Sequence, residues 1–213
     1  RGQATGQTEE VPNCTIGVGP ASNRALSGYV RGFNLDGPNA HNIELVRVEA
    51  TGNYSGVYIG DLAHHNKVKN SRFYANTIMT IKSGDDDDAG AIGILVRGDS
   101  NEIGYNTFYG HRACSPDYVI DGSSIEIYNG SFNQIHNNST NGDHAFTELG
   151  MDGSATNQMQ SNIYTGNIYT SDWSGNWYAQ PKPIPGDAFL ITRGGGNFGP
   201  VWFTTAIDNH VRS

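Results

Sequence analysis

The feature that most constrains the fold is a short phrase that recurs along the chain. The phrase is Asn, one residue, an aliphatic, two residues, a polar residue, one residue and an aromatic, and clear copies begin at Asn66 and Asn101. Weaker copies begin at His41, Asn133 and Asn157, so the starts are 25, 35, 32 and 24 residues apart. Repeats of this length indicate stacked supersecondary units, and these units are too strand-like to be helical hairpins.

A second phrase, a short strand stopped by glycine, runs in step with the first. It ends at Gly60, Gly98, Gly130, Gly150 and Gly194. Alternation within each strand places every second side chain inward. We therefore predict a parallel β-helix, in which each unit is a coil that stacks on the previous one. Asn suits the corners because it tolerates the left-handed backbone region and its amide can pair with an Asn one coil away.

An ordinary β-sandwich is the alternative fold, although its turns would not repeat the same chemistry in register. In the β-helix, we expect an interior column of Val68, Ile103, Ile135 and Met159, with Asn101 and Asn133 at one shared corner. No Pro- or Ser-rich linker divides the chain, so we expect residues 1–213 to form one domain.

Composition limits the partners. The chain has 21 acidic and 13 basic residues and a formal net charge of -8, which argues against nucleic acid or an anionic membrane. No apolar run approaches the roughly 18 residues of a membrane span, so we expect no membrane insertion. Few charged residues (16%) with abundant Asn, Ser, Thr, Gly and Tyr are typical of extracellular, secreted or cell-surface proteins.

Both ends read as unfinished coils. Residues 1–10 show no helix that would cover the first coil, and residues 209–213 resemble the opening of another. Uncovered coil ends expose unpaired backbone groups and apolar side chains. We therefore expect either a fragment of a longer solenoid or end-to-end self-association. Cys14 and Cys114 should lie about three coils, or roughly 14 Å, apart. This argues against a disulfide, which needs Cα atoms within about 7 Å, unless the N-terminal segment folds back.

The segment from Gly90 to Gly150 carries a family resemblance. Its motifs are GAIGILVRGDSNEI at 90–103, CSPDY at 114–118, DGSSIEIY at 121–128 and FTELG at 146–150. The repeats resemble those of the right-handed parallel β-helix, pectate-lyase-like superfamily, and this segment is similar to secreted bacterial β-helix repeat proteins. The resemblance implies an all-β, single-stranded right-handed parallel β-helix over about residues 25–210, and the right hand also follows from the crossover rule. The superfamily includes lyases, glycosidases, epimerases, tailspikes and adhesins, so fold alone does not select an activity.

Two glutamates in the repeats are candidates for catalysis. Counted back from their glycines, Glu126 and Glu148 fall on one outward face of adjacent coils, offset by two residues, which predicts Cα atoms about 8 Å apart. Such a separation suits either the close or the spaced carboxylate pair of a glycosidase. Asp121 would assist them. The alternative is that each is a solvated surface acid.

The long loops that lead to this face supply candidate substrate-binding residues. These are His111, Arg112 and Asp117 in an insertion, Tyr128 and His144 near the carboxylates, and Trp173 and Trp177 in a second insertion. Extra residues on one side of a repeat commonly mark a binding side. The tryptophans could instead close over the core.

The acidic run from Asp85 to Asp88 offers the hard oxygen ligands that calcium prefers. It lacks the spaced pattern of an EF-hand, so a hydrated acidic loop is the alternative. His64 and His65 are adjacent rather than spaced as metal ligands usually are. A carboxylate mechanism needs no cofactor, and calcium would be an optional ligand.

These observations predict an extracellular protein that cleaves glycosidic bonds in a polysaccharide. Hydrolysis comes first and lyase chemistry second, because a lyase needs a base such as Arg97, Arg193 or Tyr128, and the acidic balance suits a neutral glycan. The alternative is a non-catalytic structural or binding solenoid, such as a filament subunit or an adhesin.

Overall fold

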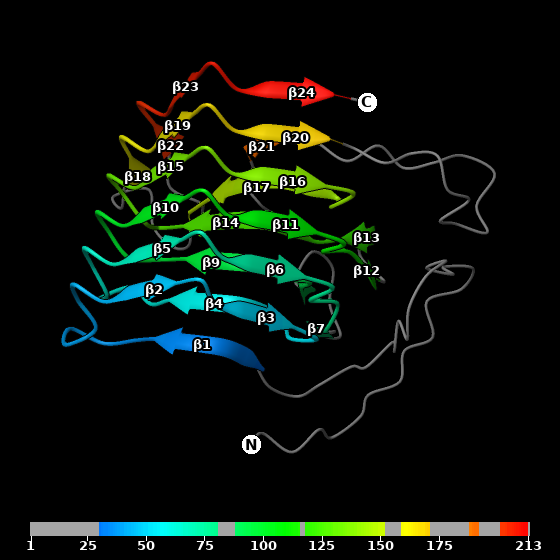
Figure 1. Cartoon of the computed structure of the whole chain (residues 1–213), viewed down its shortest axis with the longest axis horizontal. Coiled ribbons are helices and arrows are strands. Elements are labelled where there is room, and N and C mark those ends of the chain that lie inside the picture. Colours follow the sequence, from blue (N-terminus) through cyan, green and yellow to red (C-terminus); the bar gives the residue numbers. More distant parts are fainter. Residues whose placement is uncertain are drawn as a thin grey trace.

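A computed structural model describes residues 30–80, 88–115, 118–151, 159–170, 188–191 and 201–212. Within these ranges the chain is all-β and contains no helix. Most strands belong to three parallel six-stranded sheets, and within each sheet the strands lie one above another (Figure 1). No helix in the described ranges is long and apolar enough to cross a membrane.

The first sheet contains β1 (Arg31–Leu35), β4 (Ser55–Ile59), β9 (Ile92–Val96), β14 (Ser123–Tyr128), β17 (Ala145–Gly150) and β21 (Phe189–Ile191). The second contains β2 (Glu44–Val46), β5 (Lys67–Lys69), β10 (Glu102–Gly104), β15 (Gln134–His136), β19 (Ile163–Thr165) and β23 (Thr205–Ile207). The third contains β3 (Glu49–Thr51), β6 (Arg72–Tyr74), β11 (Thr107–Tyr109), β16 (Ser139–Asn141), β20 (Ile168–Thr170) and β24 (His210–Arg212). Small two-stranded sheets pair β7 (Met79–Thr80) with β8 (Ala89–Gly90), β12 (Ala113–Ser115) with β13 (Val119–Asp121), and β18 (Met159–Gln160) with β22 (Val201–Trp202).

The chain visits the first, second and third sheets in turn and then returns to the first. We call each such passage a coil. Strands of successive coils pair in parallel, from β1 at one end of the stack to β24 at the other (Figure 1). This order is compatible with the predicted parallel β-helix.

The core lies between the three sheets, and its columns follow the strand register. In the second sheet Val68, Ile103 and Ile135 stack as predicted, and all three are fully buried. The prediction for Met159 is wrong, because Met159 belongs to β18 and Tyr164 occupies the next place in the column. The fifth copy of the phrase thus begins five residues later than expected.

Every described corner between sheets has the same two-residue arrangement. The first residue has a positive φ, and the second, which we call the ladder residue, follows it at the corner, ahead of the next strand. Examples are Tyr105 (φ 58°) before Asn106 and Asn137 (φ 53°) before Asn138. Asn was expected to take the left-handed conformation at these corners itself. Instead the ladder residues of these two pairs avoid it, and the preceding residue, even a Tyr, adopts it.

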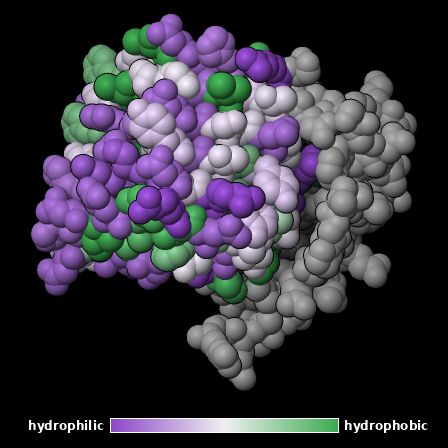
Figure 2. Space-filling model, viewed as in Figure 1, coloured by the Kyte–Doolittle hydropathy of each residue, from purple (hydrophilic) through white to green (hydrophobic). Residues whose placement is uncertain are grey.

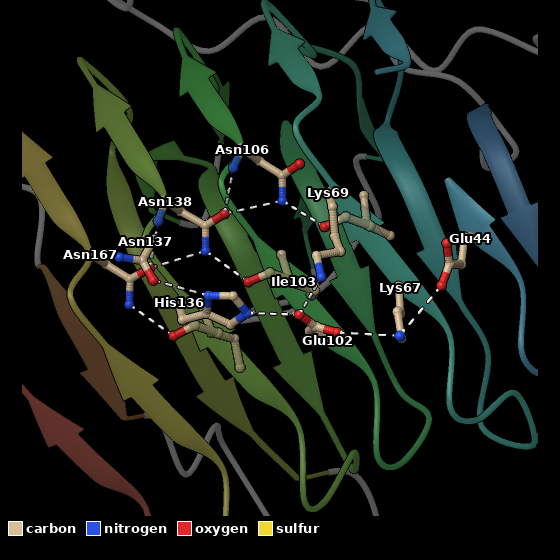
Figure 3. A network of polar contacts seen from close by, with 12 residues as sticks. Glu44, Lys67, Lys69, Glu102, Ile103, Asn106, His136, Asn137, Asn138 and Asn167 are labelled. Atoms are coloured by element: carbon tan, nitrogen blue, oxygen red, sulfur yellow. Dashed lines mark hydrogen bonds and ion pairs between the residues drawn. The ribbon is translucent and has the colours of Figure 1, made fainter. Parts of the chain in front are cut away.

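The ladder residues form a hydrogen-bonded stack at each corner. The backbone and side-chain N–H groups of Asn106 donate to Asn138 Oδ1, and Asn138 donates likewise to Asn167 (Figure 3). Asn101 and Asn133 share another corner in the same way, which confirms that prediction. The first corner, between the first and second sheets, carries Asn66, Asn101, Asn133 and Asn162, and the second carries Ser71, Asn106, Asn138, Asn167 and Asn209.

Insertions enter the fold at the third corner, between the third and first sheets. Glu148 lies five positions after ladder residue Asp143, whereas Glu126 lies fifteen positions after the equivalent His111. The extra ten residues hold the β12–β13 hairpin, and the preceding coil places the β7–β8 hairpin at the same corner. The outer faces seen in Figure 2 are mostly hydrophilic with small hydrophobic groups between. Cys14 lies outside the described residues, so its relation to Cys114 stays a prediction.

Candidate functional site

The two candidate glutamates lie side by side on the first sheet. Glu126 in β14 and Glu148 in β17 are direct register partners on adjacent strands. Their column continues downward through Leu95 and Tyr58, and it faces away from the core because Ile125 and Ile127 on either side of Glu126 point inward. Adjacent strands are about 4.8 Å apart, so the pair is closer than the expected 8 Å.

The predicted offset of two residues is wrong because the two glycines are not equivalent. Gly150 is the register partner of Tyr128, so it is the last residue of its own strand, β17. Tyr128 is the last residue of β14, and Gly130 lies two residues beyond the end of that strand. Counting back from glycine therefore misplaced Glu148 by two positions relative to Glu126.

Glu126 faces outward from the sheet and is nevertheless 6% exposed. Ser123 Oγ donates a hydrogen bond of 2.9 Å to Glu126 Oε1. Burial raises the pKa of Glu126 well above its ordinary value, and the negative charges of Glu148 and Asp121 raise it further, against the opposing effect of the Ser123 bond. The folded protein therefore favours a protonated Glu126.

Glu148 lies in a different environment. It is half-buried, and Tyr128 Oη donates a 2.6 Å hydrogen bond to its Oε1. A hydrogen-bond donor at this distance favours the ionised form of a carboxyl group. The structure thus brings Glu126, Glu148 and Tyr128 together on one outer face.

The β12–β13 hairpin brings the third acid to this face. Asp121 ends β13, accepts a 2.7 Å bond from the backbone N–H of Gly122 and is close enough to raise the pKa of Glu126. Arg112 is half-buried at the start of the hairpin, and its Cα lies 2.9 Å from where a Cβ on Gly122 would be. The predicted binding residues Asp117, Trp173 and Trp177 lie outside the described residues.

His111 is not on the outer face with the carboxylates. Its side chain is fully buried and acts as a ladder residue of the third corner, which carries Asn53, Asn76, His111 and Asp143. A buried imidazole with both nitrogens bonded to protein is not placed to contact a substrate. Sequence reasoning read His111 as part of a loop and gave Asp143 no role of its own.

The hydrogen bonds at this corner fix the tautomer of His111. Asn53 donates from its backbone and side chain to Asn76 Oδ1, so Asn76 presents its Nδ2–H to His111 Nε2 at 3.1 Å. Nε2 is therefore the acceptor, and Nδ1–H donates to Asp143 Oδ1 at 3.0 Å. In this arrangement His111 takes the place of an Asn, with one acceptor and one donor along the stack.

Asp143 ends the described part of this stack as a buried anion. It accepts bonds from the backbone and ring of His111, from Thr140 Oγ1 and from Ser124 Oγ. Burial alone would raise the pKa of Asp143, but the adjacent His111 ring and these bonds outweigh it and hold the pKa below its usual value. His144 is the next residue, half-buried, and its backbone bonds to the His111 carbonyl oxygen and to Tyr169 Oη.

Sequence reasoning missed a second polar group on the outer face of the second sheet. Glu102 is 2.7 Å from Lys69 Nζ and 3.0 Å from His136 Nε2, and it lies 3.9 Å from Lys67 Nζ (Figure 3). Its pKa is lowered, because these bonds outweigh the effect of burial, which would raise it. The signal was present as alternating charges at equivalent positions of neighbouring units. These opposite charges neutralise one another and make a surface ion-pair network.

Among the described residues, no group of three or more His, Cys, Asp or Glu side chains is arranged to hold a metal ion. Asp88 is buried and accepts a bond from Ser115 Oγ, while residues 85–87 of the acidic run lie outside the described residues. A comparison of the chain with protein-family models, curated proteins and solved structures found no match.

Proposed function

We propose that this protein is an extracellular glycoside hydrolase that acts on a neutral polysaccharide at the Glu126–Glu148 pair. The observation that carries the proposal is that two adjacent carboxyl groups lie in different environments. Burial raises the pKa of Glu126 and so favours its protonated form, whereas the Tyr128 bond favours an ionised Glu148. Two carboxyl groups with pKa values pushed apart are what acid–base cleavage of a glycosidic bond requires.

The chemistry follows from this division. Glu126 donates its proton to the glycosidic oxygen as the bond from that oxygen to the anomeric carbon breaks, and Glu148 forms a bond to the anomeric carbon. Glu126 then takes a proton from water, whose oxygen displaces Glu148 and releases the sugar. Strand spacing of about 4.8 Å is nearer to the roughly 5 Å carboxyl separation of retaining glycosidases than to the wider separation of inverting ones.

We also propose that the fold is a right-handed parallel β-helix of the pectate-lyase-like superfamily. The parallel order of three sheets and the Asn ladders support this assignment. The acidic residues on the active face favour a neutral glycan, because a polyuronate would be repelled. Lyase cleavage is the second reaction, and calcium would be needed there only to bridge the acids to an acidic glycan.

The test is glycan cleavage by the purified chain, measured as new reducing ends on a panel of neutral polysaccharides and polyuronates. Glu126→Gln and Glu148→Gln should each abolish cleavage of a neutral glycan and keep the fold. Glu102→Gln is the matched control, because Glu102 is a glutamate on another outer face and should leave the rate unchanged. Full activity in either active-face variant would refute the carboxylate pair, and cleavage that yields unsaturated ends would select the lyase.

A non-catalytic structural or binding solenoid is the second candidate function, as a filament subunit or an adhesin. The observation that favours it is the 6% exposure of Glu126, which leaves little of the carboxyl group open to a polymer. Glycan binding without new reducing ends, unaffected by Glu126→Gln, would select this function.

A further inference from the structure

We infer that Tyr128, seated across Gly150, is a positioning residue that makes Glu148 the ionised member of the pair. The inference rests on the proposed function for its meaning in catalysis. It assigns a role to two residues that do not themselves react, and it makes Gly150, the last residue of β17, part of the site.

The geometry begins with the strand register. Tyr128 in β14 and Gly150 in β17 are direct partners on adjacent strands. A Cβ placed on Gly150 would lie 2.6, 2.8 and 3.1 Å from three atoms of the Tyr128 ring. Real Cβ atoms do not approach so closely, so the ring lies where any other residue at 150 would put its side chain.

Because position 150 has no side chain, the Tyr128 ring can cross from its own strand to the next one. Its hydroxyl then reaches Glu148, two residues before Gly150 and on the same side of β17, with a bond of 2.6 Å. An O–H donor at this distance from a carboxylate is in the range of charge-assisted hydrogen bonds, which are about twice as strong as neutral ones. The contact therefore depends on both the phenol and the glycine.

Each carboxyl group of the pair has its own hydroxyl donor. Ser123 donates to Glu126 from the same strand, and Tyr128 donates to Glu148 from the neighbouring strand. The two donors alone would treat the acids alike. The difference lies in burial. For Glu126, burial raises the pKa more than the Ser123 bond lowers it. Glu148 is only half-buried, so the Tyr128 bond can still favour its ionised form. Tyr128 thus adds to the separation that burial begins.

The second sheet repeats the arrangement with other chemistry. Gly104 and His136 are register partners, and a Cβ on Gly104 would lie 2.4 Å from the His136 ring. The ring crosses this glycine and reaches Glu102, two residues before it, at 3.0 Å. A ring laid across a glycine to bond a glutamate two residues earlier is thus a construction that the fold uses twice. The second example lies outside the proposed site and provides a control.

The test measures the Glu148 carboxyl directly. Side-chain carboxyl carbons of glutamate are labelled, and their chemical shifts are followed against pH in the wild type, Tyr128→Phe, Gly150→Ala and the control Gly104→Ala. Loss of the donor should raise the pKa of Glu148 in Tyr128→Phe, and Gly150→Ala should do the same by displacing the ring. Gly104→Ala should leave Glu148 unchanged and alter Glu102 instead.

The second readout is the pH dependence of kcat/KM on a cleaved glycan. Tyr128→Phe should move the acid limb to higher pH and lower kcat/KM on that limb by about ten- to a hundredfold, the scale of a lost bond to a charged group. The double variant with Gly150→Ala should be no worse than either single one, because both remove the same contact.

The outcomes separate the two ideas. An unchanged Glu148 pKa in both Tyr128→Phe and Gly150→Ala overturns the positioning role, whatever the glycan assay gives. A raised Glu148 pKa in a chain that cleaves no glycan supports the Tyr128 contact and counts against the hydrolase. A raised pKa together with a shifted acid limb supports both.

Discussion

Removing one ladder side chain should destabilise the fold far more than its small size suggests. Asn133 is fully buried at the first corner. Its Oδ1 accepts bonds from the backbone N–H of Asn101 at 2.8 Å and from the side chain of Asn101 at 3.1 Å. Its Nδ2 donates to Gly98 O and to Asn162 Oδ1, both at 3.1 Å. Asn133→Ala deletes all four bonds.

The expected loss follows from these bonds. A buried hydrogen bond contributes about 1 kcal/mol net, so four bonds amount to about 4 kcal/mol. Asn162 Oδ1 still accepts the backbone N–H of residue 133, so this oxygen adds no further penalty. The buried backbone N–H of Asn101 is left without its acceptor, which adds about 1–3 kcal/mol. We expect Asn133→Ala to lower the free energy of unfolding by about 5–7 kcal/mol, a large part of the roughly 5–15 kcal/mol typical of a folded domain.

Urea unfolding followed by circular dichroism measures this loss. The matched control is Asn141→Ala, because Asn141 is the same residue type in a strand and is exposed on the outer side of the third sheet. That control should change stability by no more than about 0.5 kcal/mol. If Asn133→Ala unfolds within 1 kcal/mol of Asn141→Ala, the ladders do not stabilise the coils as we argue.

Four further predictions concern the core, the third corner, the Glu126 carboxyl group and the end of the stack. Ile103→Ala should cost about 2–5 kcal/mol through the cavity it leaves in the interior column, measured by urea unfolding; a cost below about 1 kcal/mol would contradict its burial. His111→Asn should be tolerated much better than His111→Ala, because Asn supplies the acceptor and the donor that this corner needs; equal melting temperatures would disprove the ladder role. The raised pKa of Glu126 means that the folded chain holds a proton that the unfolded chain has released above about pH 4.5. The free energy of unfolding should therefore fall as pH rises from about 4.5 toward the pKa of Glu126 in the folded chain. Glu126→Gln should remove this pH dependence, measured by unfolding at a series of pH values. The chain should also self-associate through the end that carries β23 and β24, where Ile207 is 51% and Val211 59% exposed; a monomer at high concentration in sedimentation would exclude it.

Much of the stacking could be predicted, because the phrase at Asn66, Asn101 and Asn133 repeats the same side chains at the same corner. The starting residue of the fifth unit could not be predicted. The first and second corners are five residues apart, so a run with Asn at 157, 162 and 167 fits the phrase equally well when shifted by one corner. Burial of Tyr164 in the column decides between the two phases, and a sequence does not display burial.

The third corner was missed for a related reason. Its ladder residues also lie five positions after those of the second corner, as His111 follows Asn106 and Asp143 follows Asn138. The residue type changes, however, and a His or Asp in a polar stretch reads as a binding residue. Here the same hydrogen-bonding capacity serves the backbone. The spacing of five was the signal that could have identified them.

The buried third corner also explains how the candidate site is formed. Ser124 points inward to Thr140 and Asp143, and the next residue, Ile125, points inward as well. Two consecutive inward residues break the alternation of β14, so Ser123 and Glu126 emerge on the same outer side three residues apart and can hydrogen-bond. A regular strand would place residues 123 and 126 on opposite faces. The inward placement of Ser124, which bonds to Thr140 and Asp143, therefore accompanies the contact between Ser123 and Glu126, and the register of β14 and β17 adds Glu148 and the Tyr128 contact. On this reasoning the candidate site depends on a buried structural corner, although none of the corner residues touches it.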